Sequence, residues 1–161
     1  MGIEERDVWQ LLEGVYDPEI PVLSVVEMGI VRRVELGAGE VTITITPTYS
    51  GCPAMDTIAA DIRGALGKTG LSITIKTVLS PAWTTAWLSE AGRNKLNNYG
   101  IAPPLTPSGD KKALLMGERV VKCPRCASTQ TKMISQFGST ACKALFQCES
   151  CLEPFDYFKC I

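Results

Sequence analysis

The sequence contains no histidine, and this absence removes several kinds of chemistry. Without an imidazole there is no histidine metal ligand, no Ser–His or Cys–His nucleophile pair, and no side chain whose ordinary pKa lies near neutrality. A Gly-rich phosphate-binding loop is missing as well. Together these absences argue against an enzyme, including one that would use a cysteine as its nucleophile.

Excess charge and long apolar runs are also missing. The net charge is -1 at pH 7, which gives no basic footprint for nucleic acid. No apolar run approaches the roughly 18 to 20 residues of a membrane span, and residues 1–6 lack the basic and apolar regions of a signal peptide. We therefore expect a cytoplasmic protein that binds neither nucleic acid nor a membrane.

Cysteine is scarce in the first part of the chain and frequent in the last. Of the seven cysteines, Cys52 stands alone and the other six lie beyond residue 122. Stable disulfides are rare in a reducing cytosol, so closely spaced cysteines indicate metal binding or redox chemistry. A chain of 161 residues can hold a core of about a hundred residues and a small appendage, and the cysteine distribution favours that organisation.

Residues 1–99 show the periodicities of a small α+β domain. Apolar residues at helical spacing predict two helices, and alternating residues predict three strands. The predicted segments are helices at 8–15 and 53–66, strands at 31–36, 41–46 and 72–79, and short helices at 81–88 and 90–98, the last capped by Ser89. The apolar helix faces expected in the core are Val8, Leu11, Leu12 and Val15, and Met55, Ile58, Ala59, Ile62 and Leu66. We therefore expect a three-stranded sheet with packed helices.

Two Cys-x-x-Cys motifs mark a second domain, predicted at 119–161 after an aperiodic, proline-containing linker at 100–118. Two such turns can present four thiolates to one zinc ion at about 2.3 Å. A domain of about forty residues has little core, whereas structural zinc contributes about 10 to 16 kcal/mol of folding free energy. The motifs predict a small all-β zinc ribbon whose ligands are Cys123, Cys126, Cys148 and Cys151.

Other interpretations of these cysteines stay open at this level. A rubredoxin-like iron, a Cys-ligated iron–sulfur cluster or a pair of disulfides would use the same four residues. Cys142 and Cys160 are left over as possible extra thiols. A cysteine in an apolar segment behaves as a small buried hydrophobe, and we expect this of Cys142 in preference to ligation.

Cys52 stands between Gly51 and Pro53, where a predicted strand gives way to a helix. With Pro53 in the first helical turn, Cys52 is expected at the N-cap, where free N–H groups and the helix dipole stabilise a thiolate. A lowered pKa would let Cys52 react or bind metal. The alternative is a packing residue beside a glycine turn. One cysteine cannot complete a metal site, so a cluster here requires a second protomer, nearby oxygen ligands or a client protein.

Two stretches of the first domain resemble a known family. They are residues 17–31 (DPEIPVLSVVEMGIV) and 46–53 (TPTYSGCP). They are similar to the iron–sulfur-assembly domain shared by SufT-like proteins and the eukaryotic cytosolic iron–sulfur targeting factors, and the similarity covers roughly residues 5–100. That family often has Asp-Leu-Gly where this sequence has Glu27-Met28-Gly29, which keeps the carboxylate but lengthens its reach.

Within that family, the whole chain resembles the PaaD (PaaJ) accessory proteins of phenylacetyl-CoA epoxidase, the ring 1,2-monooxygenase of aerobic phenylacetate degradation. The similar segments are 81–85 (PAWTT), 123–128 (CPRCAS), 137–145 (FGSTACKAL) and 153–160 (EPFDYFKC). The linker contains neither cysteine nor histidine, which differs from the expected pattern and leaves no soft ligand in that segment.

The resemblance implies a maturation factor that installs or repairs a metal centre of the epoxidase system. The clients would be the iron–sulfur cluster of the reductase component or the diiron site of the oxygenase component, and the iron–sulfur assembly machinery would be a further partner. A homodimer stays open, and a non-catalytic structural subunit of the oxygenase complex is the alternative function. The implied cofactors are structural zinc and transient iron, or an iron–sulfur cluster, at Cys52.

Several oxygen-bearing side chains are candidates to support Cys52. Carboxylates provide hard oxygen ligands for iron or contacts with a partner. The ordinary alternative is equally open, because Asp-Pro is a frequent turn sequence and a glutamate is usually a solvated surface charge. The supporting candidates are Asp17, Glu19, Glu27, Thr48 and Ser50.

Overall fold

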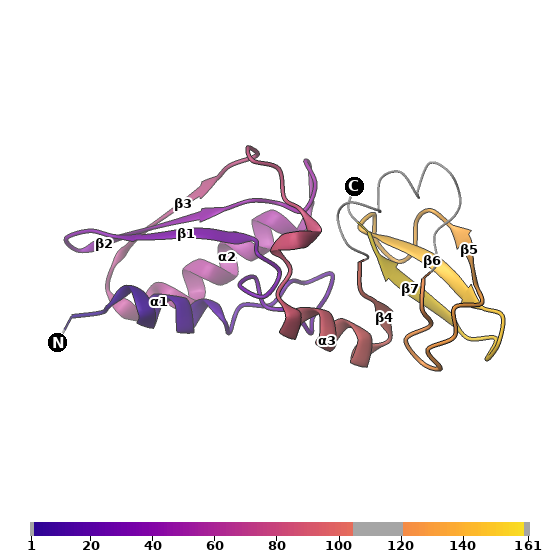
Figure 1. Cartoon of the computed structure of the whole chain (residues 1–161). Helices are drawn as coiled ribbons and strands as arrows, with labels where there is room; N and C mark the ends of the chain where they lie inside the picture. The colour runs from indigo at the N-terminus through magenta and orange to yellow at the C-terminus, as the bar shows by residue number, and fades with distance from the viewer. Residues whose placement is uncertain (1, 105–120, 160–161) are drawn as a thin grey trace. The chain divides into compact units, whose positions relative to one another are not determined.

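Three alternating segments build a sheet in the first part of the chain (Figure 1). The structure is a computed structural model that describes residues 2–104 and 121–159. Strands β1 (Val31–Leu36) and β2 (Glu40–Ile45) form an antiparallel hairpin, and β3 (Ser72–Thr77) pairs with β2 in parallel. The strands predicted from the sequence are present, and β2 is the central one.

Two helices, α1 (Glu5–Leu12) and α2 (Ala54–Leu66), lie on one face of this sheet (Figure 1). α2 connects β2 to β3, as a parallel strand pair requires a crossover. η1 (Gly67–Thr69) continues α2 and ends at Gly70, which has a positive φ of 75°. The core between the helices and the sheet contains Val8, Leu12, Val41, Ile43, Ile45, Ile58, Ile62 and Leu66, each fully buried.

Some details of the helices predicted from the sequence are wrong. α1 ends at Leu12, and Leu11 is 39% exposed, whereas Val8, Leu12 and Val15 of the predicted apolar face are buried. In α2, Met55 and Ala59 are only half-buried. Residues 81–88 form no α-helix and contain one short 3-10 turn.

The segment after β3 is held by a tertiary contact in place of the helix that its sequence predicts. The Trp83 indole is buried, and its Nε1–H donates a hydrogen bond of 2.7 Å to the Met28 carbonyl. This contact joins residues 55 positions apart and outweighs local helix propensity. Only η2 (Thr85–Trp87) remains of the predicted helix.

The chain divides into two units, Met1–Trp83 and Thr84–Ile161, and each is described by itself. α3 (Glu90–Tyr99) belongs to the second unit, whereas the sequence pattern predicted it in the first domain. Within the second unit, the Arg93 guanidinium of α3 donates to the carbonyls of Thr85 and Pro104, each at 2.7 Å, and so joins the helix to the segments on either side of it.

The predicted N-cap of α3 is present. The Ser89 side chain accepts a hydrogen bond from the Gly92 N–H at 3.0 Å. The segment after the helix differs from the predicted linker, because Ile101–Ala102 form strand β4. The rest of the predicted linker, from residue 105, lies outside the described residues.

The second unit contains a four-stranded sheet in the order β4-β7-β6-β5. Strands β5 (Thr131–Ser135), β6 (Lys143–Cys148) and β7 (Pro154–Phe158) pair antiparallel, and β4 pairs in parallel with β7. One buried cluster holds the sheet together: Ala102, Val121, Cys123, Ala144, Phe146, Cys148, Phe155 and Tyr157. This cluster is small and includes two of the predicted metal ligands. Among the described residues, no helix has the length and apolarity needed to cross a membrane.

Candidate functional site

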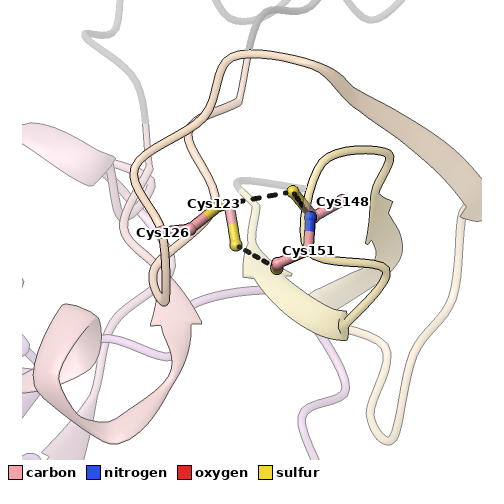
Figure 2. A group of neighbouring side chains, drawn as sticks. All are labelled: Cys123, Cys126, Cys148 and Cys151. Carbon is pink, nitrogen blue, oxygen red and sulfur yellow. Dashed lines mark hydrogen bonds between the residues drawn. The ribbon is translucent and has the colours of Figure 1, made fainter.

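Two tight turns of the second unit bring four cysteine sulfurs to one place (Figure 2). One turn precedes β5 and the other joins β6 to β7. All four Sγ atoms lie within 4.8 Å of one another, with Cys123 and Cys151 at 3.8 Å and Cys126 and Cys148 at 3.5 Å. Four sulfurs at about 2.3 Å from a tetrahedral zinc ion would be about 3.8 Å apart. The described geometry therefore fits a four-thiolate metal site of the zinc-ribbon type.

The two turns have the same pattern of hydrogen bonds from backbone N–H groups to cysteine sulfurs. The Arg125 N–H points to Cys123 Sγ and the Cys151 N–H points to Cys148 Sγ, each at 3.4 Å. Such N–H groups stabilise negative charge on a sulfur and orient it. Each Cys-x-x-Cys motif thus supplies one buried sulfur, Cys123 or Cys148, and one exposed cysteine, Cys126 or Cys151.

A strained residue follows each motif. Ala127 and Leu152 have φ of 60° and 66°, and in the described part of the chain they are the only non-glycine residues with positive φ. This left-handed conformation brings Cβ close to the backbone and costs roughly 1 to 2 kcal/mol for an L-residue. In both turns this left-handed residue directly follows the second cysteine of the motif. The repeated position indicates that the backbone needs this conformation to direct both cysteines of a motif toward one place.

Two cysteines of the cluster, Cys148 and Cys151, have pKa values that are shifted in opposite directions. The Cys151 N–H, together with neighbouring donors, lowers the pKa of Cys148 to about 6. The Glu153 N–H favours a Cys151 thiolate, but burial and the sulfurs of Cys148, Cys126 and Cys123 outweigh it and raise the pKa of Cys151 to about 12. Cys148 thus favours the thiolate and Cys151 the protonated thiol, and a bound cation would favour the thiolate at both sulfurs.

Of the two remaining cysteines of this region, the structure describes Cys142, and it does not belong to that cluster. Cys142 is 3% exposed, and its Sγ lies 3.0 Å from the Thr140 hydroxyl. The predicted burial of Cys142 is therefore present. Cys160 lies outside the described residues, so its proposed role as an extra thiol stays a prediction.

Cys52, in the first unit, is not the N-cap that the sequence pattern predicted. Pro53 occupies the N-cap of α2, so Cys52 lies one residue earlier, on the loop that follows β2. Gly51 has φ of 77°, and the Cys52 N–H donates to the Tyr49 carbonyl at 3.3 Å. The Cys52 side chain is half-buried, which keeps part of the sulfur accessible.

The predicted lowering of the Cys52 pKa is also wrong. Burial raises the pKa of Cys52 above the ordinary thiol value, and the negative charges of Glu19 and Asp17 raise it further. Hydrogen bonds from the Ala54 N–H and the Tyr49 side chain favour the thiolate but do not prevail. The helix N-terminus therefore acts in the predicted direction, and desolvation and nearby carboxylates outweigh it.

Asp17 and Glu19 influence the pKa of Cys52, whereas their predicted role as oxygen ligands or partner contacts stays a prediction, and Asp17 also has a local structural role. It is buried, and its Oδ1 accepts the N–H groups of Glu19 at 2.7 Å and Ile20 at 3.1 Å. This Asx-type turn fixes the backbone that carries Glu19. The position of Asp17 is thus compatible both with a role in forming this turn and with the predicted role in supporting Cys52.

The other predicted supporting residues are less directly placed. Glu27 and Ser24 form a reciprocal cap, in which the Ser24 N–H donates to Glu27 Oε2 at 3.0 Å and the Glu27 N–H donates to Ser24 Oγ at 3.1 Å. Thr48 is half-buried and Ser50 is exposed on the Cys52 loop. Their participation stays a prediction.

Tyr49, which contacts the Cys52 sulfur, was missed, although its position three residues before Cys52 made a contact across the turn foreseeable.

The described residues contain one group of three or more Cys, Asp and Glu side chains that is close enough to hold a metal, and it is the four-cysteine cluster. Within the described residues, Cys52 therefore does not belong to a preformed metal site. That Cys52 binds metal with ligands from elsewhere stays a prediction.

Comparison with known proteins first defines the class. Residues 5–77 match the model of an iron-sulfur cluster assembly protein, and residues 107–159 match the PaaD zinc beta ribbon domain. A crystal structure of a domain of unknown function, DUF59, from Bacillus anthracis has 28% identity and a TM-score of 0.54, covering 57% of this chain and 90% of its own. A conserved hypothetical protein from Thermotoga maritima has 26% identity and a TM-score of 0.51, covering 59% of this chain and 95% of its own. The chain joins an iron–sulfur-assembly domain to a zinc ribbon.

The family follows from two curated relatives. A protein of Escherichia coli (strain K12), named as a subunit of a "Putative 1,2-phenylacetyl-CoA epoxidase", is 51% identical over 158 residues, covering 97% of this chain and 93% of the relative. The "Fe-S protein maturation auxiliary factor" of Porphyromonas gingivalis (strain ATCC BAA-308 / W83) is 40% identical over 91 residues, covering 53% of this chain and 84% of the relative. This chain belongs to the PaaD family, as its sequence motifs predicted.

The four knuckle cysteines should behave as one metal site. Cys123→Ser or Cys151→Ser should lose about one zinc per chain and loosen the second unit, because three thiolates leave an open and weakly held site. Elemental analysis and near-UV circular dichroism measure these effects. Cys142→Ala and Cys160→Ala are the controls and should keep the metal. Iron in place of zinc, or no metal in the wild type, would contradict this prediction.

Replacing Leu152 by glycine should stabilise the second unit. Leu152 is 69% exposed, so little apolar burial is lost, and glycine adopts positive φ without the steric cost. The expected gain is about 1 kcal/mol in the free energy of unfolding of the metal-loaded protein. Urea titration measures it. Glu149→Gly, at a neighbouring position that is not among those with positive φ, is the control and should destabilise the unit; equal effects of both changes would refute the strain argument.

Cys52 should alkylate more slowly than an unperturbed thiol. Only the thiolate reacts, and a raised pKa lowers the thiolate fraction at any pH below that pKa. Glu19→Gln removes one negative charge near the sulfur and should speed iodoacetamide labelling at pH 8, followed by peptide mass spectrometry. Glu40→Gln, which removes an exposed charge at the start of β2, should have no effect. Labelling of wild-type Cys52 faster than free cysteine at pH 8 would show that the pKa is lowered after all.

Proposed function

We propose that this protein is a non-catalytic maturation factor for a metal centre of a phenylacetyl-CoA epoxidase system. The proposal is supported by the two names that its relatives carry, an epoxidase subunit in one case and an Fe-S protein maturation factor in the other. Its clients would be the iron–sulfur cluster of the reductase component or the diiron site of the oxygenase component, and it would also contact the iron–sulfur assembly machinery.

The observation that carries the proposal is the environment of Cys52. Its half-buried sulfur lies on a loop at the end of β2 and is acted on by the carboxylates of Glu19 and Asp17. Burial and, to a smaller extent, these charges raise the pKa of Cys52 and so favour the protonated thiol when no metal is near. An arriving iron ion reverses the balance, because the same carboxylates attract the cation while the thiol releases its proton and the sulfur binds the metal.

A single thiolate with nearby carboxylates is better suited to transferring iron than to holding it permanently. A resident structural site closes its coordination shell with four protein ligands, as the cluster of the second unit does. Cys52 offers one soft ligand, so iron bound there keeps positions for ligands of the donor or of the client. In this proposal the four-cysteine site stabilises the second unit with zinc, and Cys52 handles iron only transiently.

The second candidate is a structural subunit of the oxygenase complex, which the word "subunit" in the name of the Escherichia coli relative favours. Gel filtration separates the two functions. A structural subunit remains at fixed stoichiometry with the active complex, whereas a maturation factor is absent from the final complex yet is required while that complex is produced.

Cys52→Ser should lower client metallation several-fold without unfolding the protein. Serine has nearly the same size but lacks the soft sulfur ligand that iron prefers. The oxygenase and reductase components are produced with no maturation factor, with wild type or with the variant, and their iron is measured along with epoxidase turnover. The variant itself should keep its circular dichroism spectrum and its zinc. Unchanged iron in both clients, with or without the wild-type protein, would refute the maturation function.

A further inference from the structure

Thr46 is buried with an unpaired hydroxyl. The side chain is 1% exposed, and within the described residues its Oγ1 is the only buried side-chain nitrogen or oxygen atom without a hydrogen-bond partner. Buried polar groups are satisfied in the great majority of cases, because burial without a partner is unfavourable. The hydroxyl of Thr46 therefore requires an explanation that folding alone does not supply.

Strand geometry makes valine the expected residue at this position. Side chains alternate along β2, so Thr46 continues the row of Thr42 and Thr44, which are half-buried, while Ile45 faces the opposite side. A half-buried threonine can reach solvent, but the fully buried Thr46 cannot. Valine has the same shape without the hydroxyl and would fill the same space.

Thr46 also lies where the loops of the Cys52 region meet. Its N–H donates to the Ile30 carbonyl at 2.8 Å, and the adjacent Ile45 carbonyl accepts the Val78 N–H at 2.9 Å. The Cys52 loop begins at the next residue, Pro47. Thr46 is thus the last residue fixed by the sheet before the chain continues toward Cys52.

The loop that Thr46 anchors is weakly tied. Its backbone hydrogen bonds on either side of Cys52, from the Cys52 N–H to Tyr49 and from the Met55 N–H to Cys52, are both 3.3 Å long. These lengths exceed the usual 2.9 to 3.0 Å. Gly51 adds a positive φ with open space around it. A small change of the loop path is therefore less costly than a change within the sheet.

We propose that Thr46 is a positioning residue for Cys52, whose hydroxyl gains its hydrogen-bond partner when the loop adopts its metal-transferring conformation. The inference rests on the proposed function of Cys52. In the free protein the unpaired hydroxyl raises the energy of the resting loop, and pairing in the working conformation lowers the cost of reaching it. Thr46 acts through the loop and does not itself touch the metal.

The test is Thr46→Val, compared with Thr46→Ser and with Thr44→Val as the matched control on the same row. Thr46→Val should raise the melting temperature by about 4 °C or more, because it removes an unsatisfied buried group. It should nevertheless lower the iron content of the co-produced client several-fold. Thr46→Ser should restore client iron, and Thr44→Val should leave it unchanged.

The other outcomes overturn the inference. A lower melting temperature for Thr46→Val would mean that the hydroxyl already has a partner, such as a buried water molecule, in the resting protein. Client iron unchanged by Thr46→Val, or equally reduced by Thr44→Val, would remove the positioning role. Cys52→Ser, measured in the same assay, keeps the two proposals apart: if it lowers client iron while Thr46→Val does not, only the role of Thr46 fails, and if it has no effect, the proposed function fails first.

Discussion

Electrostatic repulsion among four sulfur atoms is the constraint on which the second unit depends. The Sγ atoms of the two motifs lie within 4.8 Å of one another, and two of them, Cys123 and Cys148, belong to the unit's hydrophobic cluster. Like charges at this separation repel one another, and neighbouring sulfurs contribute to the raised pKa of Cys151, whereas backbone N–H groups lower the pKa of Cys148. Because the core and the candidate metal site share Cys123 and Cys148, we expect metal binding and folding of this unit to be coupled.

In the first unit, the parallel pairing of β2 with β3 determines which segments lie near Cys52. Because α2 must cross between these strands, the loop after β2 and the segment after β3 leave the same edge of the sheet. β1 is antiparallel to β2, so the segment that enters β1 arrives at that edge as well, at Val31 opposite Ile45. Topology thus gathers the carboxylates of Asp17 and Glu19 near Cys52, although they lie more than thirty positions apart in the sequence.

Features that depend on local spacing could be predicted from the sequence, whereas features that depend on contacts between distant residues could not. Cys-x-x-Cys spacing is local and nearly sufficient, so the four clustered cysteines follow from it. Residues 81–88 were wrongly expected to be helical because the Trp83 contact with Met28 is not local. The pKa of Cys52 was wrongly expected to fall because only the adjacent helix was visible in the sequence, whereas burial and the distant carboxylates decide the sign. Nothing in the pattern distinguishes Thr46 from Thr44, since the difference lies in burial.

The clustered cysteines and Cys52 therefore differ in their surroundings, and these differences affect how each thiol would lose its proton and bind metal. In the cluster, backbone N–H groups point at Cys123 and Cys148, and four ligands close the site, which favours a metal that stays. At Cys52, burial and carboxylates favour the protonated thiol, so the proposed binding of iron there would have to displace a proton and would be readily reversed. A protein that held iron tightly at Cys52 would compete with its client for the metal. On this argument the raised pKa of Cys52, contrary to the sequence-based expectation, is the property that a transfer site requires.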